Sequence, residues 1–195
     1  STYLGGDSTD YGTAIAVDSS GYAYVTGSTA DSTTDYPTTS GAYDTTHNGG
    51  NDAFMAKFSQ VGSSLSYSTF LGGSKTDLGY CIAGDGSGYA YIGGSGLSTN
   101  FPTTTGAYDT AKNGDSDAFI VKLNPAGGGT SDLLYSTYFG SLYYTDYLLG
   151  IAVNPSGYVY VTGYTNDGTF PTTTSAYDTS YNNDYDVIFA KFNQV

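Results

Sequence analysis

Short apolar runs alternate with polar turns along the chain, and the first of them outline a unit of four strands. Residues 14–17 are apolar and end at the turn 18–21, after which residues 22–27 form a second run. A short connection that contains Gly between two such runs is typical of a β-hairpin. Residues 53–58 are a third run, and residues 65–71 alternate between apolar and polar side chains, as a half-exposed strand does. The runs are too short for helices and rich in Val, Ile, Tyr and Phe, so this stretch predicts four β-strands.

This four-strand pattern occurs three times, with a period of about 67 residues. Each copy opens with Ser-Thr and an aromatic residue, at Ser1, Ser68 and Ser136. A Gly-Tyr-x-Tyr motif follows the first hairpin turn of each copy, at Gly21, Gly88 and Gly157. A fixed period of this length indicates an array of supersecondary units, none of which buries its apolar surface alone. We therefore expect one domain, residues 1–195, built of repeats 1–67, 68–135 and 136–195.

The inner strands of the repeats do not alternate between apolar and polar residues. Residues 14–17, and their equivalents 81–83 and 150–153, are apolar or small on both faces. A sheet covered on one side only would show polar residues at every second position. Small sheets packed between like neighbours, with no helix between them, are the blades of a β-propeller. The sequence thus predicts an all-β fold of three four-stranded antiparallel propeller blades.

Several motifs resemble one known family. The first repeat contains Ser-Thr-Tyr-Leu-Gly-Gly, Ala-Ile-Ala-Val-Asp, Ala-Tyr-Val-Thr-Gly, Pro-Thr-Thr, Gly-Ala-Tyr-Asp-Thr and Asp-Ala-Phe, with counterparts in the other two repeats. This combination is similar to the SBBP-type β-propeller repeat of secreted bacterial and archaeal proteins, although that family often has Gly-Asn where this chain has Gly-Tyr. The resemblance covers essentially the whole chain. It implies a propeller at an extracellular or cell-surface location, and it does not imply a catalytic activity.

The charge of the chain is one-sided. All 18 acidic residues are Asp, all five basic residues are Lys, and the net charge is −13. Nucleic acids and anionic membranes are therefore unfavourable partners, because phosphate groups are bound through Lys and Arg. No apolar run approaches the roughly 18 residues that insertion into a membrane requires. The chain has no initiator Met and no signal sequence, so we read it as a mature or excised product.

The repeats do not match at the two ends of the array. Residues 1–4 correspond to an outer, fourth strand, whereas the last repeat stops after a third strand, residues 187–192. A closed propeller usually has at least about four blades, so we expect an open array whose N-terminal strand completes a last blade in cis or in trans. Two chains could form a six-bladed ring, many chains could add head to tail as a filament, or the residues could be part of a longer polypeptide. The predicted interface residues are Ser1, Thr2, Tyr3, Leu4, Phe189 and Phe192.

Each repeat carries a long polar connection between its second and third strands, at residues 28–51, 95–116 and 164–185. Connections of this length are uncommon in compact domains and are often functional. The tyrosines in these connections are Tyr36, Tyr43, Tyr108 and Tyr177. One interpretation is that they contact a ligand such as a glycan. The other is that they pin the loops down as small satellite cores.

Two of the connections end in alternating oxygen side chains. The two sets are Asn113, Asp115 and Asp117, and Asn182, Asp184 and Asp186. Such loops suit Ca²⁺, which takes about six to eight oxygen ligands, so Ca²⁺ is the cofactor that the sequence suggests. The first repeat has a poorer set, and no Glu is present to end an EF-hand loop. In the alternative, Asp52, Asp117 and Asp186 cap the turn before the third strand by accepting backbone N–H groups.

Signals for catalysis are scarce. His47 is the only histidine, and the other repeats have Lys112 and Tyr181 at its position. The single cysteine, Cys81, lies at a small position in an apolar strand, which predicts a packed, unreactive thiol. We therefore predict a non-catalytic extracellular structural or adhesive protein that self-associates through open blade edges. The alternatives are a carbohydrate-binding module with Tyr-rich loops, although Trp is absent, and a polysaccharide lyase or hydrolase acting through paired Asp residues.

Overall fold

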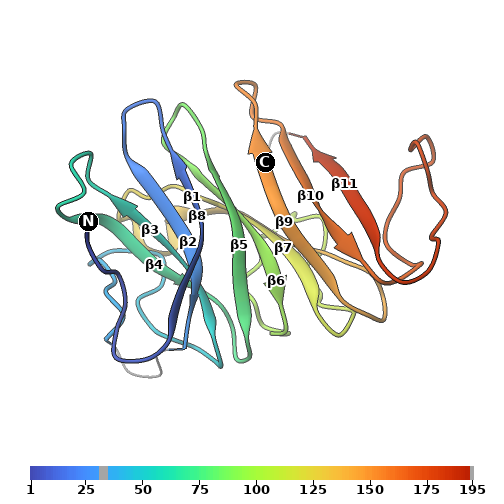
Figure 1. The fold of residues 1–195 in the computed structure, drawn as a ribbon, viewed down its shortest axis with the longest axis horizontal. Coiled ribbons are helices and arrows are strands. Elements are labelled where there is room, and N and C mark those ends of the chain that lie inside the picture. The colour runs from blue at the N-terminus through green and yellow to red at the C-terminus, as the bar shows by residue number, and fades with distance from the viewer. Residues whose placement is uncertain (31–34, 194–195) are drawn as a thin grey trace.

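The chain forms three antiparallel sheets that follow one another in sequence order, as a computed structural model describing residues 1–30 and 35–193 shows (Figure 1). Sheet 1 contains β1 (Asp10–Val17), β2 (Ala23–Thr29), β3 (Asp52–Phe58) and β4 (Leu65–Leu71). Sheet 2 contains β5 (Asp77–Gly84), β6 (Ala90–Gly96), β7 (Asp117–Leu123) and β8 (Leu133–Phe139). Sheet 3 contains β9 (Asp146–Val153), β10 (Val159–Thr165) and β11 (Asp186–Phe192). The all-β prediction is confirmed.

Helix is almost absent from the part of the chain that the structure describes. A 3-10 turn of four residues, Gly129–Asp132, precedes β8 and is the one helical element in those ranges. No helix there is long and apolar enough to cross a membrane.

The first hairpin of each sheet has a turn closed by a polar side chain. Asp18 Oδ1 accepts hydrogen bonds from the N–H groups of Ser20 and Tyr22, both at 2.9 Å. Gly21, the last residue of this turn, has φ +85°, a left-handed conformation that favours glycine. Sheets 2 and 3 repeat the arrangement with Asp85 and Gly88, and with Asn154 and Gly157. The repeated turn gives the first two strands of each sheet the same register.

Neighbouring sheets pack face to face through the first strand of the later sheet. β5 lies against β1, β2 and β3, and β9 lies against β5, β6 and β7. We call the face of a sheet that is turned toward the preceding sheet its leading face, and the opposite face its trailing face. The outermost faces of sheets 1 and 3 take the same names by equivalence of the repeats.

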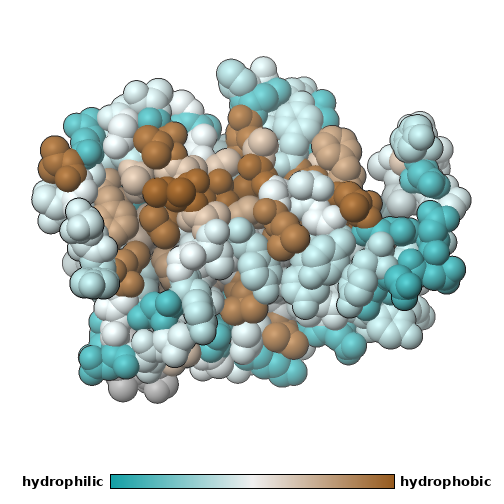
Figure 2. All heavy atoms as spheres, in the orientation of Figure 1, coloured by the Kyte–Doolittle hydropathy of each residue, from teal (hydrophilic) through white to brown (hydrophobic). Residues whose placement is uncertain are grey.

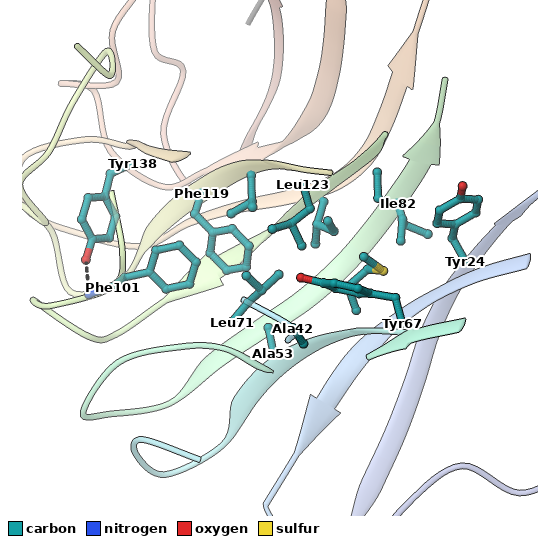
Figure 3. Close-up of a cluster of buried hydrophobic side chains, with 14 residues drawn as sticks. Tyr24, Ala42, Ala53, Tyr67, Leu71, Ile82, Phe101, Phe119, Leu123 and Tyr138 are labelled. Carbon is teal, nitrogen blue, oxygen red and sulfur yellow. Dashed lines mark hydrogen bonds between the residues drawn. The ribbon is translucent and has the colours of Figure 1, made fainter. Parts of the chain in front are cut away.

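A continuous apolar core fills the junction between sheets 1 and 2 (Figure 3). The trailing face of sheet 1 contributes Tyr24, Met55, Tyr67 and Leu71, and the leading face of sheet 2 contributes Ile82, Phe119, Leu123 and Tyr138. A second core, between sheets 2 and 3, contains Cys81, Tyr91, Ile120, Leu148, Val161 and Ile188. Each sheet therefore depends on its neighbour for burial, as expected of a repeat array.

The N-terminal residues form no strand within this chain, and their pairing in trans stays a prediction. Residues 1–9 lie outside any strand, so Ser1, Thr2, Tyr3 and Leu4 do not form the predicted outer strand within this chain. A strand needs the hydrogen-bonding edge of another strand. The edge that the equivalent residues use in sheets 1 and 2 belongs to β11 in sheet 3, at the opposite end of the fan of sheets (Figure 1). The three sheets consequently stand as an open array.

Candidate interface at the open ends of the array

The fourth strand of sheet 1 is held by β3 on one side and by the long connection after β2. Several hydrogen bonds join β4 to that connection. Thr39 N–H donates to Ser68 O and Phe70 N–H donates to Asp44 O, each at 3.0 Å, and Asp44 N–H donates to Thr69 Oγ1 at 2.9 Å. The same three bonds hold β8 in sheet 2, through Thr104 and Asp109 of the equivalent connection. A strand edge and a loop thus form a seat for the fourth strand.

Sheet 3 keeps both halves of this seat without a fourth strand in it. Within the described residues β11 pairs with β10 alone. The loop keeps its local shape, because Ala176 N–H donates to Thr173 O at 3.0 Å as Ala42 N–H donates to Thr39 O at 3.1 Å. A hollow of about 240 Å³ beside the start of β11 is lined in part by Asp178, the equivalent of Asp44. Within the described residues, the outer edge of β11 is therefore an unpaired strand edge.

The apolar faces at the two ends of the array are uncovered. On the trailing face of sheet 3, Val187 is 82% exposed and Phe189 is 72% exposed. On the leading face of sheet 1, Ile15 is 67% exposed, whereas its equivalent in sheet 2, Ile82, is 7% exposed. In the view of Figure 2, hydrophobic residues also form a band across the front of the molecule, over β1, β5 and β9. Exposed apolar patches of this kind mark interaction surfaces.

The predicted interface residues fall into different surroundings. Ser1, Thr2 and Leu4 line a hollow of about 390 Å³ over the leading face of sheet 1, and Tyr3 is fully exposed. Leu4 packs against the apolar cluster of that face. Phe189 is exposed on the trailing face of sheet 3. Phe192 instead packs within the chain, with its ring 5.1 Å from that of Phe139, so it belongs to the junction between sheets 2 and 3.

The acidic residues before each third strand act as caps. Asp117 Oδ2 accepts from Asn113 N–H at 2.8 Å, and its Oδ1 accepts from Gly114 N–H at 2.9 Å. Asp52 and Asp186 accept from Asn48 and Asn182 N–H in the same way. These bonds confirm the capping interpretation.

The calcium prediction gains no such support from the geometry. In the described ranges, no group of three or more His, Cys, Asp or Glu side chains is placed to hold a metal ion. Asp115 and Asp184 are exposed. Both oxygens of Asp117 are already engaged by backbone N–H groups. Ca²⁺ at these loops stays a prediction.

The four loop tyrosines do not form one surface. Tyr36 is 1% exposed in the apolar cluster of sheet 1, and burial raises the pKa of its hydroxyl. Tyr43 is partly buried, and burial raises its pKa as well. Tyr108 rests edge-on against Phe139 at 5.9 Å, and Tyr177 is fully exposed. Tyr36 and Tyr43 are therefore loop anchors, as the satellite-core interpretation expects.

Sequence reasoning missed a row of tyrosines that runs from sheet 2 across sheet 3. The ring centroids are 5.9 Å apart for Tyr80 and Tyr147, 4.9 Å for Tyr147 and Tyr164, and 5.3 Å for Tyr164 and Tyr185. Neither Tyr164 nor Tyr185 follows the repeat, since sheets 1 and 2 have Ser or Asn at their positions. Departures from the repeat, rather than its shared motifs, were the signal that could have revealed this row.

The single cysteine and the single histidine lie inside the fold. Cys81 is 5% exposed, and burial raises the pKa of its thiol to about 12, so it is the packed, unreactive thiol that was predicted. His47 is partly buried, with its ring edge-on to Phe70 at 5.7 Å.

Comparison with known proteins identifies two segments of the chain. Residues 1–32 and 134–171 match the family model described as SBBP, beta-propeller repeat. Both segments begin around a Ser-Thr-Tyr motif and continue through the first two strands of the following sheet. The resemblance seen in the motifs is thereby confirmed for these two segments. No curated protein matches the chain significantly.

Proposed function

We propose that this chain is a non-catalytic β-propeller protein of the cell surface or extracellular space that assembles with copies of itself through its open ends. One observation carries the proposal. The edge of β11 and its loop form the same seat that holds β4 and β8, while residues 1–4, which share the motif of β8, lie outside any strand. Addition of an extended segment to an exposed sheet edge is a common mode of protein association.

The filled seats define the register of this contact. In sheet 1, Leu71 lies opposite Ala53, Phe70 opposite Phe54 and Thr69 opposite Met55, and sheet 2 has the same register. By equivalence, Leu4, Tyr3 and Thr2 of one copy would lie opposite Val187, Ile188 and Phe189 of the next. The donor segment and the acceptor edge are different surfaces, so copies add head to tail.

Removal of residues 1–6 tests the proposal. The shortened chain keeps all eleven strands, because residues 1–9 belong to none of them, so its circular dichroism should match that of the full chain. Light scattering over a range of concentrations should show that the full chain assembles and that the shortened chain does not. A full chain that is monomeric at every concentration would mean that something other than a second copy covers the open ends.

The tyrosine row favours a second candidate function, binding of a neutral glycan. Tyr147, Tyr164 and Tyr185 bring aromatic rings and hydroxyl groups to one surface of sheet 3. Aromatic side chains with a polar tip suit ligands that are partly apolar and partly hydrogen-bonding. A glycan array with the wild type and Tyr164→Ala tests this candidate. Signal lost in the variant would support this candidate, and no signal above background would remove it.

A further inference from the structure

Gly12 has no steric reason to be glycine within its own chain. It is exposed, and a Cβ atom built on it would meet only Val25 Cγ1, at an ordinary contact distance of 3.8 Å. Its equivalent in sheet 2 differs. A Cβ atom on Gly79 would lie 2.5 Å from Thr26 Oγ1 and 3.0 Å from Gly27 O, both in sheet 1. Gly79 is therefore required by the sheet that packs on it, whereas Gly12 is not.

At the junction between sheets 2 and 3, the same two positions meet, but the glycine is on the earlier sheet and the larger side chain is on the later sheet. Leu148 occupies the position of Gly79, and Gly93 occupies the position of Thr26. Leu148 is fully buried. A Cβ atom on Gly93 would lie 3.4 Å from Leu148 Cβ across the junction and 2.8 Å from Cys81 Sγ within sheet 2. Each junction thus pairs one glycine with one side chain at the point where the first strand of a sheet crosses the preceding sheet.

The two open ends together carry a glycine and a threonine like those at the junction between sheets 1 and 2. The glycine is Gly12 on sheet 1, and the threonine is on sheet 3. Thr162 stands on the trailing face of sheet 3 at the position of Thr26, and it is exposed. Its hydroxyl donates to Ile188 O at 2.9 Å, as the Thr26 hydroxyl donates to Phe54 O at 2.7 Å. The two threonines therefore have the same orientation. A glycine at position 12 and a threonine at position 162 match the pair Gly79 and Thr26.

We infer that copies of this chain join by stacking sheet 1 of one copy on sheet 3 of the next, with Gly12 seated over Thr162 as Gly79 is seated over Thr26. The inference rests on the proposed self-association and specifies its geometry. The occupant of the open leading face is a second copy, because this chain itself supplies the matching threonine. The β1 strand of the added copy crosses β10 and β11, as β5 crosses β2 and β3.

Exchange of the two residues tests this geometry. Gly12→Leu should weaken association at least tenfold in sedimentation equilibrium, because a side chain would face Thr162. The double variant Gly12→Leu with Thr162→Gly reproduces the pair Leu148 and Gly93 and should recover association to within about threefold of the wild type. Thr162→Gly alone should differ from the wild type by no more than about threefold. Gly86→Leu is the matched control, since a Cβ atom there meets nothing within 4 Å.

The outcomes separate this inference from the proposed function. Unchanged melting curves would show that the variants fold. Association that survives Gly12→Leu, or a double variant no better than Gly12→Leu alone, would overturn the stacking geometry. If removal of residues 1–6 still abolished assembly in that case, the proposed self-association would stand without it. A wild type that stays monomeric would overturn both.

Discussion

Two equivalent strands, β7 in sheet 2 and β11 in sheet 3, differ in whether their trailing face is covered by another sheet. In β7, Ala118 and Ile120 are fully buried beneath sheet 3. In β11, the equivalent Val187 and Phe189 are 82% and 72% exposed. The strands are alike in sequence, so the difference comes from whether a further sheet lies on them. In a repeat array an apolar residue stabilises the fold through the junction that covers it, so the exposed Val187 and Phe189 add little to the stability of the single chain.

The same comparison shows how the open face departs from the filled one. Ser95, 3% exposed, donates its hydroxyl to Asp146 O of the next sheet at 2.9 Å. In sheet 3, Tyr164 replaces this serine, and the neighbouring Val187 replaces the smaller Ala118. Extra volume at a close-packed contact opposes close approach. We therefore expect the joint between copies to be weaker than the internal junctions.

Truncation of a side chain to Ala at a filled junction should change the free energy of unfolding more than any other substitution considered. Ile120→Ala removes a fully buried side chain at a filled junction and should lower the free energy of unfolding by about 2–4 kcal/mol. Phe189→Ala removes an exposed side chain and should change the free energy of unfolding by less than about 0.5 kcal/mol. Urea unfolding at a concentration where the chain is monomeric measures both. Equal losses would contradict the assignment of filled and open faces.

A buried carboxylate near the first junction should make the fold less stable at high pH. Burial raises the pKa of Asp52 from 3.8 to about 6, and nearby Asp77 adds repulsion. The folded state therefore holds this proton more tightly than the unfolded chain does. Its stabilising contribution is complete below pH 3.8 and is lost as the pH rises through 6.

The variant Asp52→Asn measures this contribution. It should reduce the fall in unfolding free energy between pH 4 and pH 8 by about 1–2 kcal/mol. Asp7→Asn removes an equal charge from an exposed site and is the control for the overall charge of −13. Identical pH profiles for Asp52→Asn and the wild type would show that this carboxylate does not titrate between the two states.

Giving sheet 3 the small residues of the other sheets should strengthen association. Tyr164→Ser with Val187→Ala reproduces the trailing faces of sheets 1 and 2. The dissociation constant between copies should fall about tenfold, or ~1.4 kcal/mol. Tyr177→Ser makes the same kind of change at a fully exposed tyrosine outside this face and should have no effect. Weaker association in the double variant would show that Tyr164 and Val187 are contacts rather than obstacles.

Removal of divalent cations should have the smallest effect. The capping bonds at Asp117 and Asp186 already use these carboxylates, so EDTA should shift the melting temperature by less than about 1 °C. A bound ion at a hundredfold excess over its Kd would add about 2.7 kcal/mol. At about 2–4 °C per kcal/mol for a chain of this size, its loss would lower the melting temperature by several degrees. A fall of that size, reduced by Asp117→Asn, would establish calcium at these loops.

The fold was legible from the sequence because its signals are local and occur three times. The apolar run at residues 14–17, the turn at Asp18 and the alternation at residues 65–71 each correspond to an observed element. The sequence did not show whether residues 1–4 form a strand. They have the sequence of a strand, but the edge that they would pair with lies at the far end of the array. Whether such a segment pairs depends on which segment binds that edge. The local pattern of apolar and polar residues does not specify this.

The candidate interface could be predicted only in part, for a related reason. The mismatch of strand number at the two ends followed from counting strands in each repeat. The pairing of Gly79 with Thr26, and of Leu148 with Gly93, depends on which face of a bulged strand crosses the neighbouring sheet. That crossing joins residues about 50 positions apart, and a single sequence does not reveal such pairs. Gly12 becomes recognisable as a candidate contact residue only once this crossing is known from the structure.

Mixing two altered chains tests head-to-tail assembly most directly. The first lacks residues 1–6 and can only accept a strand. The second carries a copy of residues 59–71 after Phe192, so that its own sheet 3 gains a fourth strand and the chain can only donate. Each should sediment alone as a monomer, and an equal mixture should form a 1:1 complex and nothing larger. A mixture that stays monomeric while the wild type assembles would contradict strand exchange at β11, and a wild type that remains a 20.3 kDa species at every concentration would contradict self-association itself.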